Sequence, residues 1–126
     1  MENYTQKEKI KYALRTLGVP QHLLGYEYLT TAIDLVIDDK SYAHEITRRL
    51  YPQIAELHNT TNSRVERTIR HAIEKSFSLM PHTVMFSVFG NTLSYDKDHP
   101  TNGHYIVAIA DVIRSGNNEY LIPCEE

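Results

Sequence analysis

The stretch Tyr51–Phe77, YPQIAELHNTTNSRVERTIRHAIEKSF, decides the fold of this chain. Pro52 suits the first turn of a short helix over residues 52–58, because its missing N–H costs nothing there. The polar run HNTTNS, residues 58–63, is dense in residues that make turns and cap helices. A longer helix follows, to about residues 77–79. Two helices joined by a short polar turn, with charges on the outer face of the second, are typical of a helix-turn-helix that reads DNA through the major groove.

The second helix of this pair is predicted to have two different sides, because successive helical residues are turned by about 100°. One side is apolar and must bury against the first helix and the core. It holds Val65, Ile69, Ala72, Ile73 and Ser76. The other side is offered to solvent or to a partner. It holds Ser63, Glu66, Arg67, Arg70, His71 and Glu74.

The residue types on this outer side fit the reading of DNA. Arginine can donate two parallel hydrogen bonds to guanine O6 and N7, and glutamate can accept one from cytosine N4. A site containing G and C is therefore the natural complement, and each good bidentate contact discriminates by roughly 1–3 kcal/mol. Contacts to the DNA backbone or other auxiliary contacts are predicted for residues within and beside the hairpin. These are Arg48, Arg49, Thr61, Asn62, Ser63, Arg64, His71 and Lys75.

Simpler interpretations of the same residues stay open at this point. A charged outer face of a helix is as often merely solvated. Ser63-x-x-Glu66 matches a capping box, in which Glu66 would bond back to the start of the helix. Glu74 could pair with Arg70, four residues earlier. His71 is more often a plain surface residue than a contact.

The rest of the chain also favours helices, and the fold class that we predict is all-α, with about six helices and an embedded helix-turn-helix. Thr5 is a candidate N-cap and Gly18 a candidate C-terminal glycine of the first helix. Apolar spacing and start or stop signals predict these further helices: 5–17, 25–38, one that contains Ile46 and Leu50 and ends before Pro52, 82–89 ending at Gly90, and 103–115. Residues 91–99 are predicted to form a loop. We divide the chain into a helical domain, 1–116, and a polar acidic tail, 117–126.

Composition restricts the classes of function. The chain has 126 residues, enough for one packed domain. It holds no apolar run long enough to span a membrane, and its N-terminus lacks the apolar core of a signal peptide. We therefore expect a cytoplasmic protein with no membrane partner. The seven histidines are scattered without metal-ligand spacing, and Cys124 has no histidine near it in sequence. No enzyme, metal or cofactor is expected.

The charge balance is uneven along the chain. The net charge of −3 argues mildly against a nucleic-acid binder, since such domains are often basic. Residues 26–45 hold five acidic residues and one lysine, whereas residues 46–75 hold six basic and three acidic residues. The local field is the one that matters at a DNA surface. The helix-turn-helix region is therefore basic on an otherwise acidic chain.

Three longer runs resemble one known family. They are HNTTNSRVERTIRHAIE, LGVPQHLLGYEYL upstream and FGNTLSYDKDHPTN downstream. Together they closely resemble the C-terminal DNA-binding effector domain of the stage-zero sporulation master regulator, a response-regulator transcription factor of endospore-forming bacteria. The resemblance covers about residues 10–114. It implies a six-helix domain that binds double-stranded DNA at a short G- and C-containing promoter box and regulates transcription. In that family the residues matching Glu66, Arg67 and Arg70 contact bases.

The resemblance also implies protein partners. Residues matching about 83–93 contact the RNA polymerase sigma subunit, and the helix matching 102–114 pairs effector domains as a homodimer on tandem sites. The family protein carries an N-terminal receiver domain, and these 126 residues show none. Either it has been removed or the protein is a stand-alone effector; the initial Met and the unrelated tail NNEYLIPCEE favour the second. The rival hypothesis, motivated by the acidic flanks, is a helix-turn-helix that modulates another regulator without binding DNA specifically.

Overall fold

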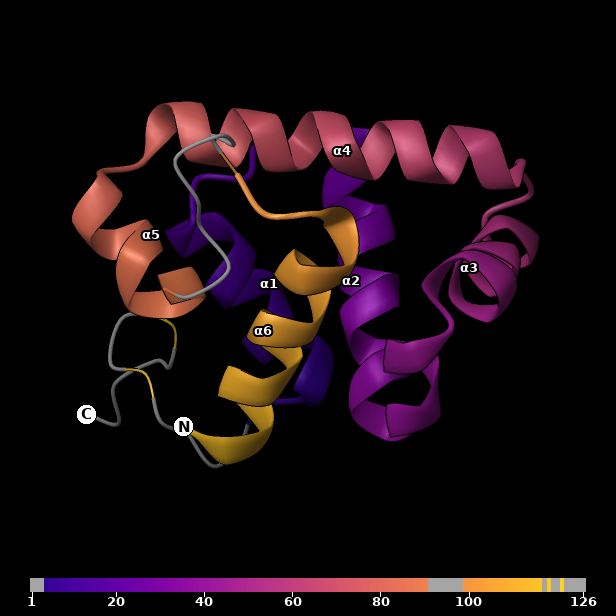
Figure 1. The fold of residues 1–126 in the computed structure, drawn as a ribbon, viewed down its shortest axis with the longest axis horizontal. Coiled ribbons are helices and arrows are strands. Elements are labelled where there is room, and N and C mark those ends of the chain that lie inside the picture. Colours follow the sequence, from indigo (N-terminus) through magenta and orange to yellow (C-terminus); the bar gives the residue numbers. More distant parts are fainter. Residues whose placement is uncertain (1–3, 91–98, 117, 119–120, 122–126) are drawn as a thin grey trace.

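The computed structural model describes residues 4–90, 99–116, 118 and 121, and within them the fold is all-helical (Figure 1). The six α-helices are α1 (Gln6–Thr16), α2 (Leu24–Asp38), α3 (Tyr51–Leu57), α4 (Asn62–Leu79), α5 (His82–Phe89) and α6 (Asn102–Ser115). The predicted all-α fold with about six helices is confirmed. The predicted loop, apart from His99, and most of the tail lie outside the described residues. The domain boundary at residue 116 stays a prediction.

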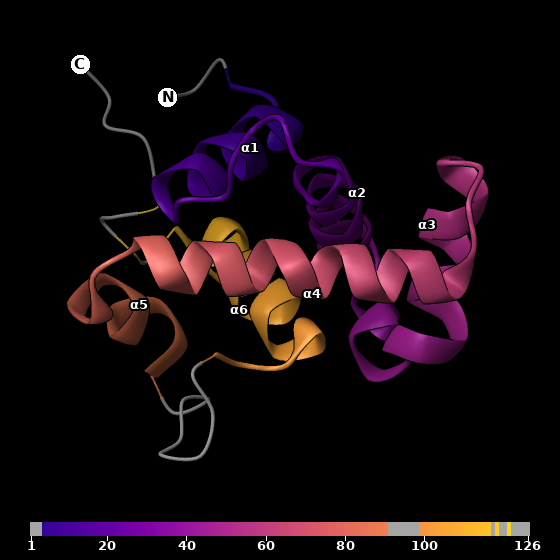
Figure 2. The ribbon, with the colours of Figure 1, turned by 90° about the horizontal axis from the view of Figure 1, so that it is seen from above.

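The helix α4 runs along one edge of the molecule, with α1, α2 and α6 beneath it (Figures 1 and 2). Of these, α2 is the most central, since it packs against α1, α3, α4 and α6. Gly25 lets α2 and α4 approach closely. A Cβ atom at Gly25 would lie 2.6 Å from the Cβ of Ala72 and 2.8 Å from the carbonyl oxygen of Thr68. The seating of α4 on α2 therefore requires glycine at this position.

A fully buried polar contact joins α4, α6 and the end of α1. Ser76 of α4 donates a hydrogen bond of 2.7 Å to the carbonyl oxygen of Leu17, just after α1, and accepts one of 3.0 Å from the hydroxyl of Tyr105 in α6. Burial raises the pKa of the Tyr105 phenol. Around this contact the core is apolar. Its largest members include Ile10, Leu14, Leu29, Ile33, Ile54, Ile69, Ile73, Met85 and Phe89.

Several predicted helix ends are confirmed. Thr5 caps α1 through a reciprocal pair of hydrogen bonds with Glu8. Gly18, just past α1, has a φ of +83°, in the left-handed region that glycine adopts without strain. Gly90 ends α5 as predicted. These ends were predictable because each depends on a residue type at one position relative to the helix.

The segment before α3 differs from the predicted separate helix that ends before Pro52. Residues Lys40–His44 form a 3-10 helix, and Ile46–Leu50 form a π-helical turn that runs directly into α3. Tyr51 keeps a right-handed helical backbone and donates its N–H to the carbonyl of Ile46. Pro52 therefore sits in the first turn of α3, as predicted, but the chain makes no break in front of it. The wide π-helical turn continues the helix past Pro52, which has no N–H to donate.

Candidate nucleic-acid interface

The helices α3 and α4 form the predicted helix-turn-helix. The helix α3 ends at Leu57, and the chain reverses over His58–Thr60. Asn59 adopts a φ of +55°, a left-handed conformation that asparagine tolerates better than most residues. The N–H of Thr60 then bonds the carbonyl of Ala55 at 2.9 Å, which closes the turn. The hairpin is thus fixed by its own backbone and packs against α2.

The start of α4 overturns the capping-box alternative. Thr61 is the N-cap, and its hydroxyl accepts a hydrogen bond of 3.3 Å from the N–H of Arg64. The helix begins at Asn62, so Ser63 lies within the first turn. Glu66 bonds to Arg70 and not to the start of the helix. The side chains of Asn62 and Ser63 are exposed at the end of α4 where N–H groups have no helical partner.

The two sides of α4 are placed as the 100° spacing predicted. The five residues of the apolar stripe are at most 1% exposed. On the outer side Arg67, His71 and Glu74 are exposed, and Glu66 and Arg70 are half-buried. The pattern alone could not say whether this outer side is covered; the structure leaves Arg67, His71 and Glu74 exposed and covers Glu66 and Arg70 in part.

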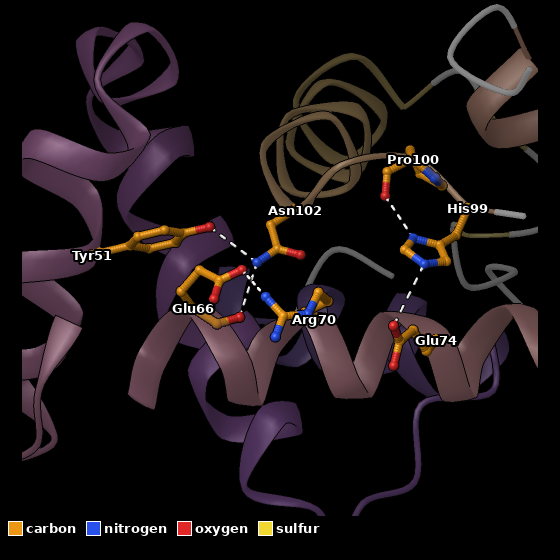
Figure 3. Close-up of polar contacts among 7 residues, drawn as sticks. All are labelled: Tyr51, Glu66, Arg70, Glu74, His99, Pro100 and Asn102. Carbon is orange, nitrogen blue, oxygen red and sulfur yellow. Dashed lines mark hydrogen bonds and ion pairs between the residues drawn. The ribbon is translucent and has the colours of Figure 1, made fainter. Parts of the chain in front are cut away.

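Glu66 and Arg70 form an ion pair one turn apart on α4 (Figure 3). Their side chains are 39% and 43% exposed, so both remain reachable from outside. The alternative pairing of Arg70 with Glu74 is wrong, because Arg70 turns toward the start of the helix. Glu74 instead lies 3.7 Å from Nε2 of His99. A guanidinium has five N–H donors, so the contact with Glu66 leaves Arg70 donors for a further acceptor.

The cations predicted to contact DNA fall into two groups. Arg48, Arg64, Arg67 and Lys75 are exposed, and their side chains make no hydrogen bond or ion pair within the described part of the chain. His71 is exposed in the same way. This first group is therefore available to a partner.

Arg49 is different because the acidic segment before it engages its side chain. It donates a hydrogen bond of 2.7 Å to Ser41 and lies 3.6 Å from Asp39 and 3.5 Å from Glu45. Its guanidinium also lies 4.5 Å from the centre of the Tyr42 ring. Hydrogen bonds from Ser41, with the charge of Arg49, hold the pKa of Asp39 below its usual value. Of the predicted backbone contacts, Arg49 has the least structural support.

A groove of about 740 Å³ lies beside the Glu66–Arg70 pair. The π-helical turn, α4 and the first turn of α6 line it, and Asn102 lies at its wall. The Asn102 amide donates hydrogen bonds of 3.0 Å to the Tyr51 hydroxyl and 3.1 Å to the Glu66 carbonyl (Figure 3). Burial raises the pKa of the Tyr51 phenol, and the nearby Glu66 charge adds to this. Asn102 entered the sequence-based expectations only within the helix matched to pairing, residues 102–114, and Tyr51 was not predicted to be part of the site.

No three His, Cys, Asp or Glu side chains of the described residues gather where they could hold a metal ion. None of the helices described is both long and apolar enough to cross a bilayer.

A short helix, a tight turn and a longer helix with an open charged face define a DNA-binding domain of the helix-turn-helix class. Residues 10–113 match the family described as "Sporulation initiation factor Spo0A C terminal". The chain belongs to this family, whose members are DNA-binding effector domains of transcription factors and not enzymes. The resemblance seen in the sequence is confirmed.

Proposed function

We propose that this domain regulates transcription by reading a short G- and C-containing promoter box with Glu66, Arg67 and Arg70. The observation that carries the proposal is their position on α4. All three lie in the first half of the second helix of the hairpin, away from its buried stripe. In helix-turn-helix proteins this part of the helix meets the base edges in the major groove.

The Glu66–Arg70 pair suits base reading because it orients a flexible side chain. The carboxylate holds one end of the guanidinium, and the remaining donors can meet guanine O6 and N7. Less side-chain entropy is then lost on binding than for an unrestrained arginine. Arg67, which has no such partner in the described part of the chain, would read a neighbouring base with more freedom.

The flank of α4 opposite Glu66 and Arg70 supplies the proposed contacts to phosphates. On the 100° spacing, Arg64, His71 and Lys75 fall together on this flank. At the start of the helix Thr61, Asn62 and Ser63 are exposed beside free N–H groups, a favourable place for a phosphate. Phosphate contacts would fix the register of the helix on the duplex, and base contacts would select the sequence.

We also propose the two protein partners that the family resemblance implies. Two copies would pair through α6 on tandem boxes, since α6 leaves His104 and Asp111 exposed. The RNA polymerase sigma subunit would bind residues 83–93, of which 91–93 lie outside the described residues. Phe86 of α5 is 56% exposed and gives this segment an apolar contact point. Phe86→Ala should lower activation in a reconstituted transcription assay and leave DNA affinity unchanged.

A titration of the whole chain against fluorescent duplexes tests the proposed function. The duplexes share length and base composition and differ in the order of G and C, and each titration is repeated at several salt concentrations. We expect tight binding to a subset of duplexes and weakening of all binding as salt rises. Equal and negligible binding to every duplex would favour the rival function, a protein-interaction module that does not read DNA.

A further inference from the structure

The Asn102 side chain joins three helices at the base-reading end of the site. Asn102 is the first residue of α6 and is only 9% exposed. Its amide nitrogen lies 3.0 Å from the hydroxyl of Tyr51, the first residue of α3, and 3.1 Å from the carbonyl oxygen of Glu66 in α4. Figure 3 shows the amide between these two acceptors. A single side chain therefore spans α3, α4 and α6.

The bond to Glu66 acts on the backbone of α4 and not on the Glu66 side chain. A carbonyl within a helix already accepts the N–H four residues later, and its second lone pair takes the Asn102 amide. The bond therefore fixes where the Glu66 backbone lies relative to α6. The carboxylate that holds Arg70 starts from this same backbone position.

The first turn of α6 is itself firmly seated, so Asn102 is a fixed point. A Cβ atom at Gly103 would lie only 3.2 Å from Cγ1 of Ile46, which shows how closely α6 packs against the π-helical turn. Thr101 caps α6 by accepting a hydrogen bond of 3.2 Å from the N–H of His104. This cap stabilises the same turn but makes no contact with α4 among the hydrogen bonds of the described residues.

We infer that Asn102 is a positioning residue for base reading. Through its bonds to the Glu66 carbonyl and the Tyr51 hydroxyl, it fixes where the backbone of α4 lies at Glu66 and how the helix is rotated there. The inference rests on the proposed reading of bases by Glu66 and Arg70. Without the bond, α4 would keep its buried stripe and its exposed cations. It would lose the fixed position from which the Glu66–Arg70 pair meets a base pair.

The test compares two neighbouring substitutions at the start of α6, Asn102→Ala and Thr101→Ala. The probes are the duplex that the unaltered chain enriches from a randomised pool and a scrambled duplex of the same composition. The measured quantity is the dissociation constant for the scrambled duplex divided by that for the enriched duplex, so a higher ratio means greater specificity. The melting temperature of each variant is recorded beside it. Asn102→Ala should lower the ratio about five- to tenfold, a part of what one good base contact supplies. Thr101→Ala should lower the melting temperature and change the ratio less than about twofold.

A third variant, Asn102→Asp, guards against a loss of folding. Aspartate is favoured in the first turn of a helix, but its carboxylate cannot donate to the Glu66 carbonyl. It should therefore keep α6 and still lower the ratio. The inference is overturned if both Asn102 variants keep the ratio, or if Asn102→Ala and Thr101→Ala lower it in proportion to lost stability. If the unaltered chain enriches no duplex, the proposed function fails and this inference fails with it.

Discussion

Arg70 donates a hydrogen bond to Glu66, four residues earlier on α4, so the two side chains proposed to read neighbouring bases are bonded to each other. The order, with glutamate nearer the start of the helix, is the favourable one for such a pair. Both side chains stay partly exposed, so the pair adds little to the stability of the fold. Its larger effect is to limit the directions in which Arg70 can point.

Replacing Glu66 by glutamine should therefore separate recognition from stability. We expect Glu66→Gln to change the free energy of unfolding by less than about 0.5 kcal/mol, because an exposed i,i+4 pair contributes no more. The same change should alter the preferred base at one or two positions of the box. Glu74→Gln is the matched control. It removes an equal charge from α4, but the Glu74 side chain lies beside His99 and not beside Arg70. Identical base preferences for both variants and the unaltered chain would contradict the assignment.

Arg67 and Lys75 should behave differently when each is shortened to alanine. Arg67→Ala should relax the preference for one base pair, at a cost of roughly 1–3 kcal/mol on the best duplex and less on others. Lys75→Ala should weaken binding to all duplexes by similar factors, because a phosphate contact carries no sequence information. Dissociation constants for a panel of single-base variants of the box measure both effects. Uniform losses for Arg67→Ala would show that it does not read a base.

Two adjacent arginines give a sharp test of which cations meet the DNA backbone. Arg48 is exposed and unpaired in the described part of the chain, whereas Arg49 is engaged by Asp39, Glu45 and Ser41. Each phosphate contact adds about 0.9 to the slope of log affinity against log salt. Arg48→Ala should lower that slope by about this amount. Arg49→Ala should leave it unchanged, and the reverse result would mean that DNA displaces the acidic partners of Arg49.

Ser76→Ala should destabilise the fold without touching the exposed side of α4. The substitution removes the acceptor of the Tyr105 hydroxyl and the donor to the Leu17 carbonyl, both in the core. A buried polar group without a partner costs about 1–3 kcal/mol. Urea unfolding should show a loss in this range, and Ser78→Ala, at an exposed site on the same helix, should show less than about 0.5 kcal/mol. Equal losses for the two variants would contradict the buried contact.

Stability should fall in alkali because of the buried tyrosines. Burial raises the pKa of Tyr105, and of Tyr51 to a smaller extent, above the ordinary value of 10.0. The neutral phenols are fully compatible with the fold below pH 10, and above it the unfolded chain loses protons that the folded chain keeps. The free energy of unfolding should then decrease by up to about 1.4 kcal/mol per pH unit for each such group. Above pH 10 the free energy of unfolding of Tyr105→Phe, measured from unfolding curves, should decrease less steeply with pH than that of the unaltered chain. An unchanged slope would exclude Tyr105 as a cause.

The parts of the fold that sequence predicted best depend on local signals. The cap at Thr5 and the stripe from Val65 to Ser76 depend on residues within a few positions of one another. The start of α4 was harder, because Thr61 and Ser63 are both good caps and only one can be used. The π-helical turn before Tyr51 was not predicted, since apolar spacing over five residues does not distinguish it from an ordinary helical turn.

The contacts around the site were predictable only in part. The exposed side of α4 follows from helical spacing. The hydrogen bond between Asn102 and Tyr51 joins residues 51 positions apart, and nothing in the sequence marks that pair. Arg49 was predicted to contact DNA from its charge alone, and the acidic residues that lie near it in the fold were not considered. Its engagement by Asp39 and Glu45 depends on how the 3-10 helix and the π-helical turn fold together.

The most direct measurement is the selection of duplexes from a randomised pool by the unaltered chain and by Arg70→Ala, with sequencing of the bound DNA. We expect the unaltered chain to enrich one short box that contains G and C. Arg70→Ala should enrich the same box with the preference lost at one position, because the other base contacts remain. If the unaltered chain enriches no box, or if Arg70→Ala and Arg67→Ala both enrich it unchanged, α4 does not read bases as proposed.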